Sequence, residues 1–248
     1  MNRRLPLYAG PILLLLSACG SDEPPRRPTD PATAIVTVDR GGGLAPPVEQ
    51  WTLPDFTLFG DGTAVVRGET RGAVLSGVRR TVPADRITEL YRLAQEAGLF
   101  QGRVHDSDIV DGDVLTVRIA DEAGTHETTV AGPDADDGGD RGEVVAFADA
   151  ALGSGADAGE YRPERYAVLV PAGSDGRGEA RPWPLAVPLS GLAGAPSQPC
   201  QVLGPAEAGP VLAALGDAGP DTRWESEGRR VALVIRPLLP DERTCADL

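Results

Sequence analysis

The chain contains no lysine, so all 23 of its basic residues are arginines. This absence excludes a Walker A phosphate loop, a Schiff-base lysine and a Ser-Lys dyad. The only histidines are His105 and His126, and neither an H-E-x-x-H nor a C-x-x-C motif occurs, so a transition-metal site has few ligands to draw on. No serine lies within G-x-S-x-G, which excludes a nucleophile elbow.

Aromatic residues make up only 4% of the chain, which disfavours a sugar-binding site built on aromatic platforms. The three tryptophans are Trp51, Trp183 and Trp224, and we expect them mainly to anchor the core. Trp183 stands between Pro182 and Pro184 and is the candidate for an exposed binding aromatic, with packing as the alternative.

The first 18 residues have the parts of a secretory signal peptide. Arg3 and Arg4 precede an apolar run at 5–16, which is shorter than the ~20 residues needed to cross a bilayer. The next stretch, Leu16-Ser17-Ala18-Cys19, resembles the lipobox of bacterial lipoproteins at all four positions. The resemblance implies that the Cys19 thiol receives a diacylglyceryl group and that the signal is cut before Cys19. The alternative is an ordinary secretory signal that happens to contain a cysteine.

Residues 19–50 are predicted to form a lipidated cysteine followed by a tether rich in proline and glycine. Residues 20–34 include four prolines and little apolar mass, so they should stay extended. At ~3.1 Å per residue these 15 residues would reach about 45 Å. Residues 35–38 (Ile-Val-Thr-Val) are open to a second interpretation as a first strand.

The charge of the chain is strongly acidic. Removing the signal takes away two of the 23 arginines and leaves 37 acidic residues, a formal charge of about −16. Such a body is repelled by phosphate backbones, so no nucleic-acid partner is expected. The partners predicted instead are the bacterial membrane, through the lipid on Cys19, and an envelope protein. The predicted location is therefore the extracytoplasmic face of the cell membrane.

Cys200 and Cys245 are the cysteines left after lipidation of Cys19. An exported chain meets an oxidising environment, where two cysteines usually pair, so we predict a structural disulfide between them. Two free thiols or a catalytic cysteine are the alternative.

The hydrophobic pattern after the tether predicts an α+β fold, mostly antiparallel sheet with two or three packed helices. We divide it into an N-terminal part at 51–155 and a C-terminal part at 161–248, which are either two similar βββαββ halves or one domain. Hairpins are predicted at 56–66 and 113–130; strands at 73–81, 166–170, 181–187, 200–203 and 231–240; and helices at 83–98, 143–152 and 205–219.

Two acidic loops are the candidates for a hard-cation site. Residues 105–113 hold His105 and four aspartates, namely Asp106, Asp108, Asp111 and Asp113. Calcium takes carboxylate oxygens from flexible loops, but the EF-hand pattern fails because Val110 occupies the fifth position and Gly112 comes one place late. A solvated turn at 111–112 is the alternative. The loop at 134–140 fits worse, and no cofactor is predicted.

The chain also resembles the large group of uncharacterised lipoproteins exported by high-GC Gram-positive bacteria, which carries no known activity. Beyond the lipobox, the resemblance lies in "LFGDGTAVV", in the helix after "TVP" and in the "RPLLPDE" ending. We therefore expect a non-enzymatic binding module of the cell envelope. The alternatives are a hydrolase that depends on acidic residues with a calcium site, and an inhibitor of a secreted enzyme.

Overall fold

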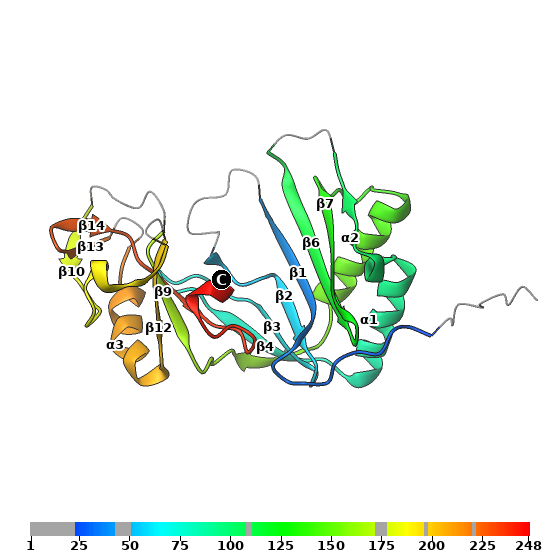
Figure 1. Cartoon of the computed structure of the whole chain (residues 1–248), viewed down its shortest axis with the longest axis horizontal. Coiled ribbons are helices and arrows are strands. Elements are labelled where there is room, and N and C mark those ends of the chain that lie inside the picture. The colour runs from blue at the N-terminus through cyan, green and yellow to red at the C-terminus, as the bar shows by residue number, and fades with distance from the viewer. Residues whose placement is uncertain (1–22, 43–50, 108–110, 172–177, 196–197, 220–221) are drawn as a thin grey trace, which may run out of the picture.

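The computed structural model describes residues 23–42, 51–107, 111–171, 178–195, 198–219 and 222–248 (Figure 1). The signal peptide, Cys19 and Asp108 lie outside the described residues. The fold is α+β with mostly antiparallel sheets, as predicted. None of the described helices is long and apolar enough to cross a bilayer.

An eight-stranded sheet forms the larger part of the molecule. Its strands lie in the order β5-β7-β6-β1-β2-β3-β4-β8, and every neighbouring pair is antiparallel except β5 and β7. The strands are β1 (Ala34–Gly42), β2 (Phe56–Phe59), β3 (Thr63–Arg67), β4 (Gly77–Thr81), β5 (Val104–His105), β6 (Asp113–Asp121), β7 (Gly124–Ala131) and β8 (Ala156–Glu160). The hairpins predicted at 56–66 and 113–130 are confirmed as β2–β3 and β6–β7.

Two helices, α1 (Ala84–Glu96) and α2 (Gly139–Leu152), cover one face of this sheet (Figure 1). Helix α1 follows the extended Pro83 and buries the predicted stripe of Ile87, Leu90, Tyr91 and Ala94. The predicted stop is also present, since Gly98 has a φ of 66° in the left-handed region that glycine favours. Helix α2 begins four residues before the predicted 143, within the acidic loop.

Strand β1 lies within the residues that were predicted to form the tether, so that prediction is wrong for residues 34–42. Residues 34–42 were assigned to the tether, yet β1 lies between β2 and β6, and Ile35, Val36 and Val38 are fully buried. The interpretation of 35–38 as a strand is therefore the one observed. The chain before β1 is packed as well: an Arg27 Nη donates to the carbonyl of Gly60 at 2.7 Å, and the carbonyl of Arg26 accepts from Glu122 N–H at 3.1 Å.

Because of strand β8, the boundary between the two parts lies later in the chain than predicted. Residues 156–160 were left between the two predicted parts, but they form β8, which pairs with β4 at the edge of the large sheet. Gly155 serves the close approach of these strands, since its φ is 83° and an added Cβ would lie 2.9 Å from the carbonyl oxygen of Thr81. The N-terminal part therefore runs to Glu160 rather than 155.

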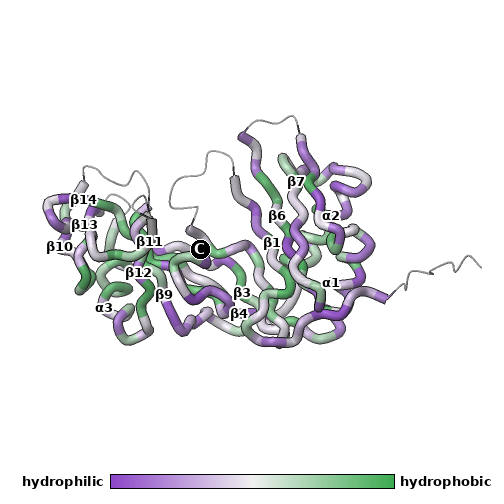
Figure 2. The backbone as a smooth tube through the Cα atoms, in the orientation of Figure 1, coloured by the Kyte–Doolittle hydropathy of each residue, from purple (hydrophilic) through white to green (hydrophobic). Residues whose placement is uncertain are grey.

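The C-terminal part contains two smaller sheets, ordered β11-β12-β9-β15 and β10-β13-β14. Their elements are β9 (Tyr166–Leu169), β10 (Ala180–Pro182), β11 (Ala193–Ala195), β12 (Gln198–Leu203), α3 (Pro205–Gly216), β13 (Arg223–Ser226), β14 (Arg229–Val231) and β15 (Val234–Pro237). Helix α3 covers one face of the four-stranded sheet, and hydrophobic segments are visible in β12 as in β6 (Figure 2). Because these strand orders differ from that of the large sheet, the two parts do not share one topology.

Two predicted strands of this part are shorter than expected. The strand at 231–240 is divided between β14 and β15, which belong to different sheets. The strand at 181–187 is reduced to β10, because Pro182 and Pro184 lack the N–H groups that a ladder needs.

The two parts share backbone and side-chain contacts. The segment at 73–75 leaves the large sheet and pairs with β15, where Leu75 N–H donates to the Ile235 carbonyl and Ile235 N–H to the Ala73 carbonyl, each at 2.9 Å. A small apolar cluster joins Leu53, Phe59 and Val65 to Leu239. The C-terminus lies between the two parts (Figure 1).

A buried ion pair holds the last segment in place. Arg236 is only 5% exposed, and its two Nη atoms donate to Glu242 at 2.8 and 2.9 Å. Glu242 also accepts from the backbone N–H of Leu239 at 2.7 Å. This arrangement folds residues 237–242 into a tight return over the face of the large sheet that the helices leave free.

Glu242→Gln should destabilise the protein by about 3–5 kcal/mol, because it leaves the buried Arg236 charge without a partner. Urea denaturation measures the change. The matched control is Glu89→Gln, which removes one exposed partner of Arg92 on α1 and should change stability little. Equal effects of the two substitutions would contradict the role given to the buried pair.

Candidate functional site

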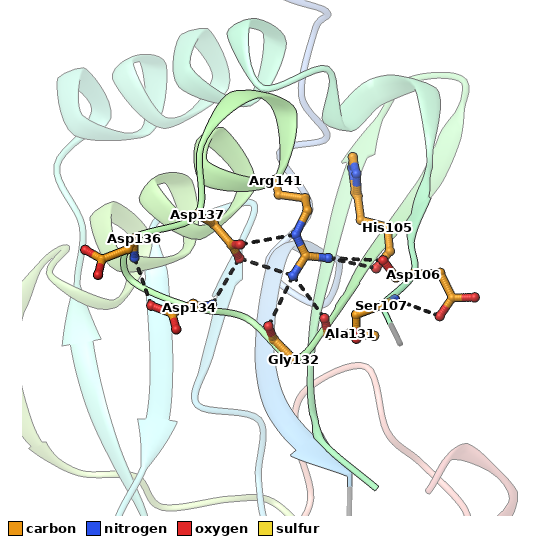
Figure 3. A network of polar contacts seen from close by, with 9 residues as sticks. All are labelled: His105, Asp106, Ser107, Ala131, Gly132, Asp134, Asp136, Asp137 and Arg141. Carbon is orange, nitrogen blue, oxygen red and sulfur yellow. Dashed lines mark hydrogen bonds and ion pairs between the residues drawn. The ribbon is translucent and has the colours of Figure 1, made fainter. Parts of the chain in front are cut away.

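Arg141 joins the two acidic loops that the sequence analysis singled out (Figure 3). Its guanidinium, carried by the first part of α2, donates to the carbonyls of Ala131 and Gly132 at 3.0 and 3.1 Å. It also reaches the carbonyls of His105 and Asp106, each at 3.4 Å. The network therefore binds β5, the end of β7 and the start of α2 to one another.

Asp137 provides the carboxylate of this network. Its Oδ2 accepts from the Asp134 backbone N–H at 3.0 Å and from Arg141 at 3.2 Å, and these contacts lower the pKa of the Asp137 carboxyl. The cation between the loops is thus an arginine of the chain itself.

The residues proposed as a metal site are not brought together. The carboxylates of Asp106, Asp111 and Asp113 are exposed, and Asp111 has a positive φ of 62°, as expected of the turn at 111–112. Asp108 lies outside the described residues. Among the residues that are described, no group of three or more His, Cys, Asp or Glu side chains is placed to hold a metal ion.

The single residues considered as binding groups have structural contacts. Trp183 is half-buried against the α3 core, and its Nε1 donates to the Val187 carbonyl at 2.7 Å. His126 lies half-buried on the helix-covered face, edge-on to Phe100, with its Nε2 3.2 Å from Asp121 Oδ2. Both side chains therefore belong to the packing of their strands and loops.

Cys200 and Cys245 form the predicted disulfide, which ties β12 to the short helix η4 (Cys245–Asp247). A loop of this length gives about 4 kcal/mol in the loop-entropy estimate. Beside the disulfide lies a mainly apolar hollow of about 610 Å³, whose lining includes Trp51, Leu169, Val202 and Leu248.

A second cavity lies over a row of side chains that crosses the large sheet. Val65, Thr57, Thr37, Arg118 and Glu127 are successive cross-strand partners in β3, β2, β1, β6 and β7. They share the face opposite the helices, because the alternating residues beside them, such as Leu58 and Val38, are buried in the helix-covered core. Thr57 and Thr37 are 2% and 9% exposed, whereas Arg118 and Glu127 form a half-exposed pair at 2.7 Å.

The return segment 237–242 covers part of this row and leaves a cavity of about 480 Å³. The floor includes Thr37 and Thr57, one wall includes Arg118, and the return segment contributes Leu239 and Asp241. In the described part of the chain, the Thr57 hydroxyl has no hydrogen-bond partner although it is buried. Buried polar groups normally have partners, so this hydroxyl oxygen, which is closed off from solvent, is an exception in the fold.

Like Asp247, Asp241 is an exposed carboxylate of the cavity lining without an ion pair among the described residues. Its neighbour Glu242 is already bound to Arg236, and Asp247 accepts three hydrogen bonds from Arg243 and Thr244. Desolvation by the surrounding chain raises the pKa of the Asp241 carboxyl, and the neighbouring Glu242 adds to the shift. This site is not visible in the sequence, because residues 240–242 (Pro-Asp-Glu) have the composition of an ordinary turn and line a cavity only once the return segment lies over the sheet.

Comparison of the chain with family models, with curated proteins and with solved structures finds no match.

Arg141→Met should loosen the two acidic loops, since it removes the donor shared by four backbone carbonyls. We expect a loss of about 1–3 kcal/mol of stability and faster hydrogen exchange at 103–107 and 129–137. Urea denaturation and exchange mass spectrometry measure the two effects. Arg92→Met, which breaks exposed pairs on α1, should leave these loops protected; the same change in both variants would contradict the account.

Proposed function

We propose that this protein is a lipid-anchored binding protein of the cell envelope, held on the extracytoplasmic face of the cell membrane through Cys19. The anchor is supported by the match of residues 16–19 to a lipobox behind a short signal segment. The binding role rests on one observation: the face of the large sheet opposite the helices carries a cavity of about 480 Å³, and its lining includes the exposed carboxylate of Asp241.

The packed segment before β1 sets the distance between anchor and body. Because residues from Arg26 on are hydrogen-bonded to the large sheet, the free tether is far shorter than the 45 Å expected for residues 20–34. Even fully extended, the seven peptide units from Cys19 to Arg26 span about 25 Å. The body is therefore held close to the bilayer, with the β6–β7 turn near the point of entry because Glu122 binds Arg26.

The features that suggested a hydrolase or an enzyme inhibitor are not found among the described residues. The hydrolase with a calcium site relied on His105 and the nearby aspartates, but Asp106, Asp111 and Asp113 are exposed and do not converge. The inhibitor relied on a tandem repeat, whereas the two parts differ in strand order. Neither function is proposed.

Cys19→Ser should move the protein from the membrane fraction to a soluble or unprocessed form, because the diacylglyceryl group can no longer be attached. Detergent-phase partitioning of tagged wild-type and variant chains measures this, with Cys245→Ser as the control that keeps the anchor. In the same strains, crosslinking on intact cells should enrich an envelope protein. Partitioning of Cys19→Ser into the detergent phase would contradict the anchor, and the absence of any enriched partner would contradict the binding role.

A further inference from the structure

A further cavity, of about 500 Å³, lies against the return segment and is lined by Arg162, Arg165 and Arg243. Arg162 and Arg165 lie between β8 and β9, and Arg243 directly follows the return segment. Arg162 and Arg243 are exposed and Arg165 is half-buried, so a molecule in solution can reach this group. We call these three residues the arginine cluster.

The arginine cluster has no partner within the protein. In the part of the chain that the structure describes, none of its guanidinium groups donates a hydrogen bond or forms an ion pair. Most of the other described arginines are paired with carboxylates. Acidic residues outnumber arginines by 37 to 23 in the chain, so a shortage of carboxylates does not account for the difference. Unpaired guanidinium groups that line one cavity are typical of a surface that binds an anion from another molecule.

Two carboxylates also line the cavity, but they do not neutralise the arginine cluster. Glu242 is already bound by Arg236 at 2.8 and 2.9 Å, and Glu164 is exposed and forms no ion pair among the described residues. With Arg236 counted, four positive charges stand against two negative ones around the cavity. A body that is acidic overall therefore carries a local excess of positive charge here.

A phosphate group suits this excess better than a carboxylate does. A guanidinium fork binds two oxygens of one anion, so a planar carboxylate is filled by one or two arginines, whereas a tetrahedral phosphate offers oxygens in several directions. The lining also includes Pro31, Leu238 and Pro240, which offer apolar contact to the organic part of a phosphate ester. A long polyanion such as a nucleic acid is disfavoured, because the body as a whole is acidic.

We propose that the cavity lined by the arginine cluster binds a phosphate group, which the guanidinium groups of Arg162, Arg165 and Arg243 hold by charge-assisted hydrogen bonds. Two sources share this chemistry: a soluble phosphate ester, and the headgroup of an anionic phospholipid in the membrane to which the body is tethered. The inference goes beyond the proposed binding role, because it concerns a different cavity and names the chemistry of its ligand. Only the lipid source depends on the anchor.

The test uses the Cys19→Ser form of the full chain, labelled with ¹⁵N, in a buffer without phosphate. Inorganic phosphate and glycerol 3-phosphate are the probes. We expect saturable chemical-shift changes at millimolar probe, confined to residues around Arg162, Arg165 and Arg243. Acetate at the same ionic strength should bind at least about fivefold more weakly, because it satisfies fewer guanidinium donors.

Substitutions in the arginine cluster separate specific binding from bulk charge. Arg162→Gln and Arg243→Gln should each weaken phosphate binding about tenfold, because each removes a charge-assisted hydrogen bond. Both residues are exposed, so the variants should fold normally. Arg230→Gln is the matched control: it removes the same charge from an exposed arginine on β14 and should leave binding unchanged.

Co-sedimentation with phosphatidylglycerol vesicles distinguishes the two sources. If the ligand is a lipid headgroup, the Cys19→Ser chain should sediment with these vesicles more than Arg162→Gln and Arg243→Gln made in the same background, and glycerol 3-phosphate should reduce the difference. If the ligand is a soluble ester, the three chains should sediment equally while the probes still bind.

The absence of saturable binding by both phosphate probes would overturn the proposal. Equal binding by Arg162→Gln, Arg243→Gln and Arg230→Gln would also overturn it, because the effect would then come from bulk charge. The probe measurement needs neither lipid nor a partner protein. Failure of the anchor would therefore appear in fractionation, and failure of the phosphate site would appear here.

Discussion

The contact between Arg236 and Glu242 fixes the path of the last twelve residues, and both parts of the protein depend on that path. Arg236 lies on the face of β15 away from α3, and Glu242 folds the chain back over it. Leu239 is thereby placed against Phe59 and Val65 of the large sheet. The disulfide then ties the chain beyond the return segment to β12. An ion pair buried to this extent is costly to break, because either partner left alone is a desolvated charge.

The same segment creates the candidate site. Without residues 237–242 over them, Thr57 and Thr37 would be ordinary polar residues on the solvent face of an antiparallel sheet. With the segment in place, these two residues line a cavity to which the segment contributes Leu239 and Asp241. The stability of the C-terminal return and the shape of the site are therefore two consequences of one packing arrangement.

Local patterns in the sequence predicted the elements that depend on near neighbours. The stripe from Ile87 to Ala94 defined α1, and short turns defined both hairpins, because their contacts lie within a few residues. Strand β8 was missed, and β1 was predicted only as an alternative for residues 35–38, for the opposite reason. The partners of β1 include β6, about 80 residues further along the chain, and its flanking prolines and glycines gave a compositional signal for a tether. Gly155, directly before β8, serves the close approach of β8 to β4 rather than flexibility.

The chemistry of the site was equally hidden from the sequence. The acidic loops were visible as clusters of carboxylates, but the cation that joins them is Arg141, which lies on α2 beyond the second loop. The row Val65, Thr57, Thr37, Arg118 and Glu127 comes from five strands, so only the register of the sheet reveals it. The disulfide was predictable because only two candidate cysteines remained.

The return segment makes the two parts one cooperative unit, and native-state hydrogen exchange in low urea tests this most directly. We expect the amides of β2 and β3 in the large sheet to open together with those of β9 and β15, with one common free energy. A C-terminal sheet that opens at a distinctly lower free energy, while β1, β2 and β6 stay protected, would contradict it.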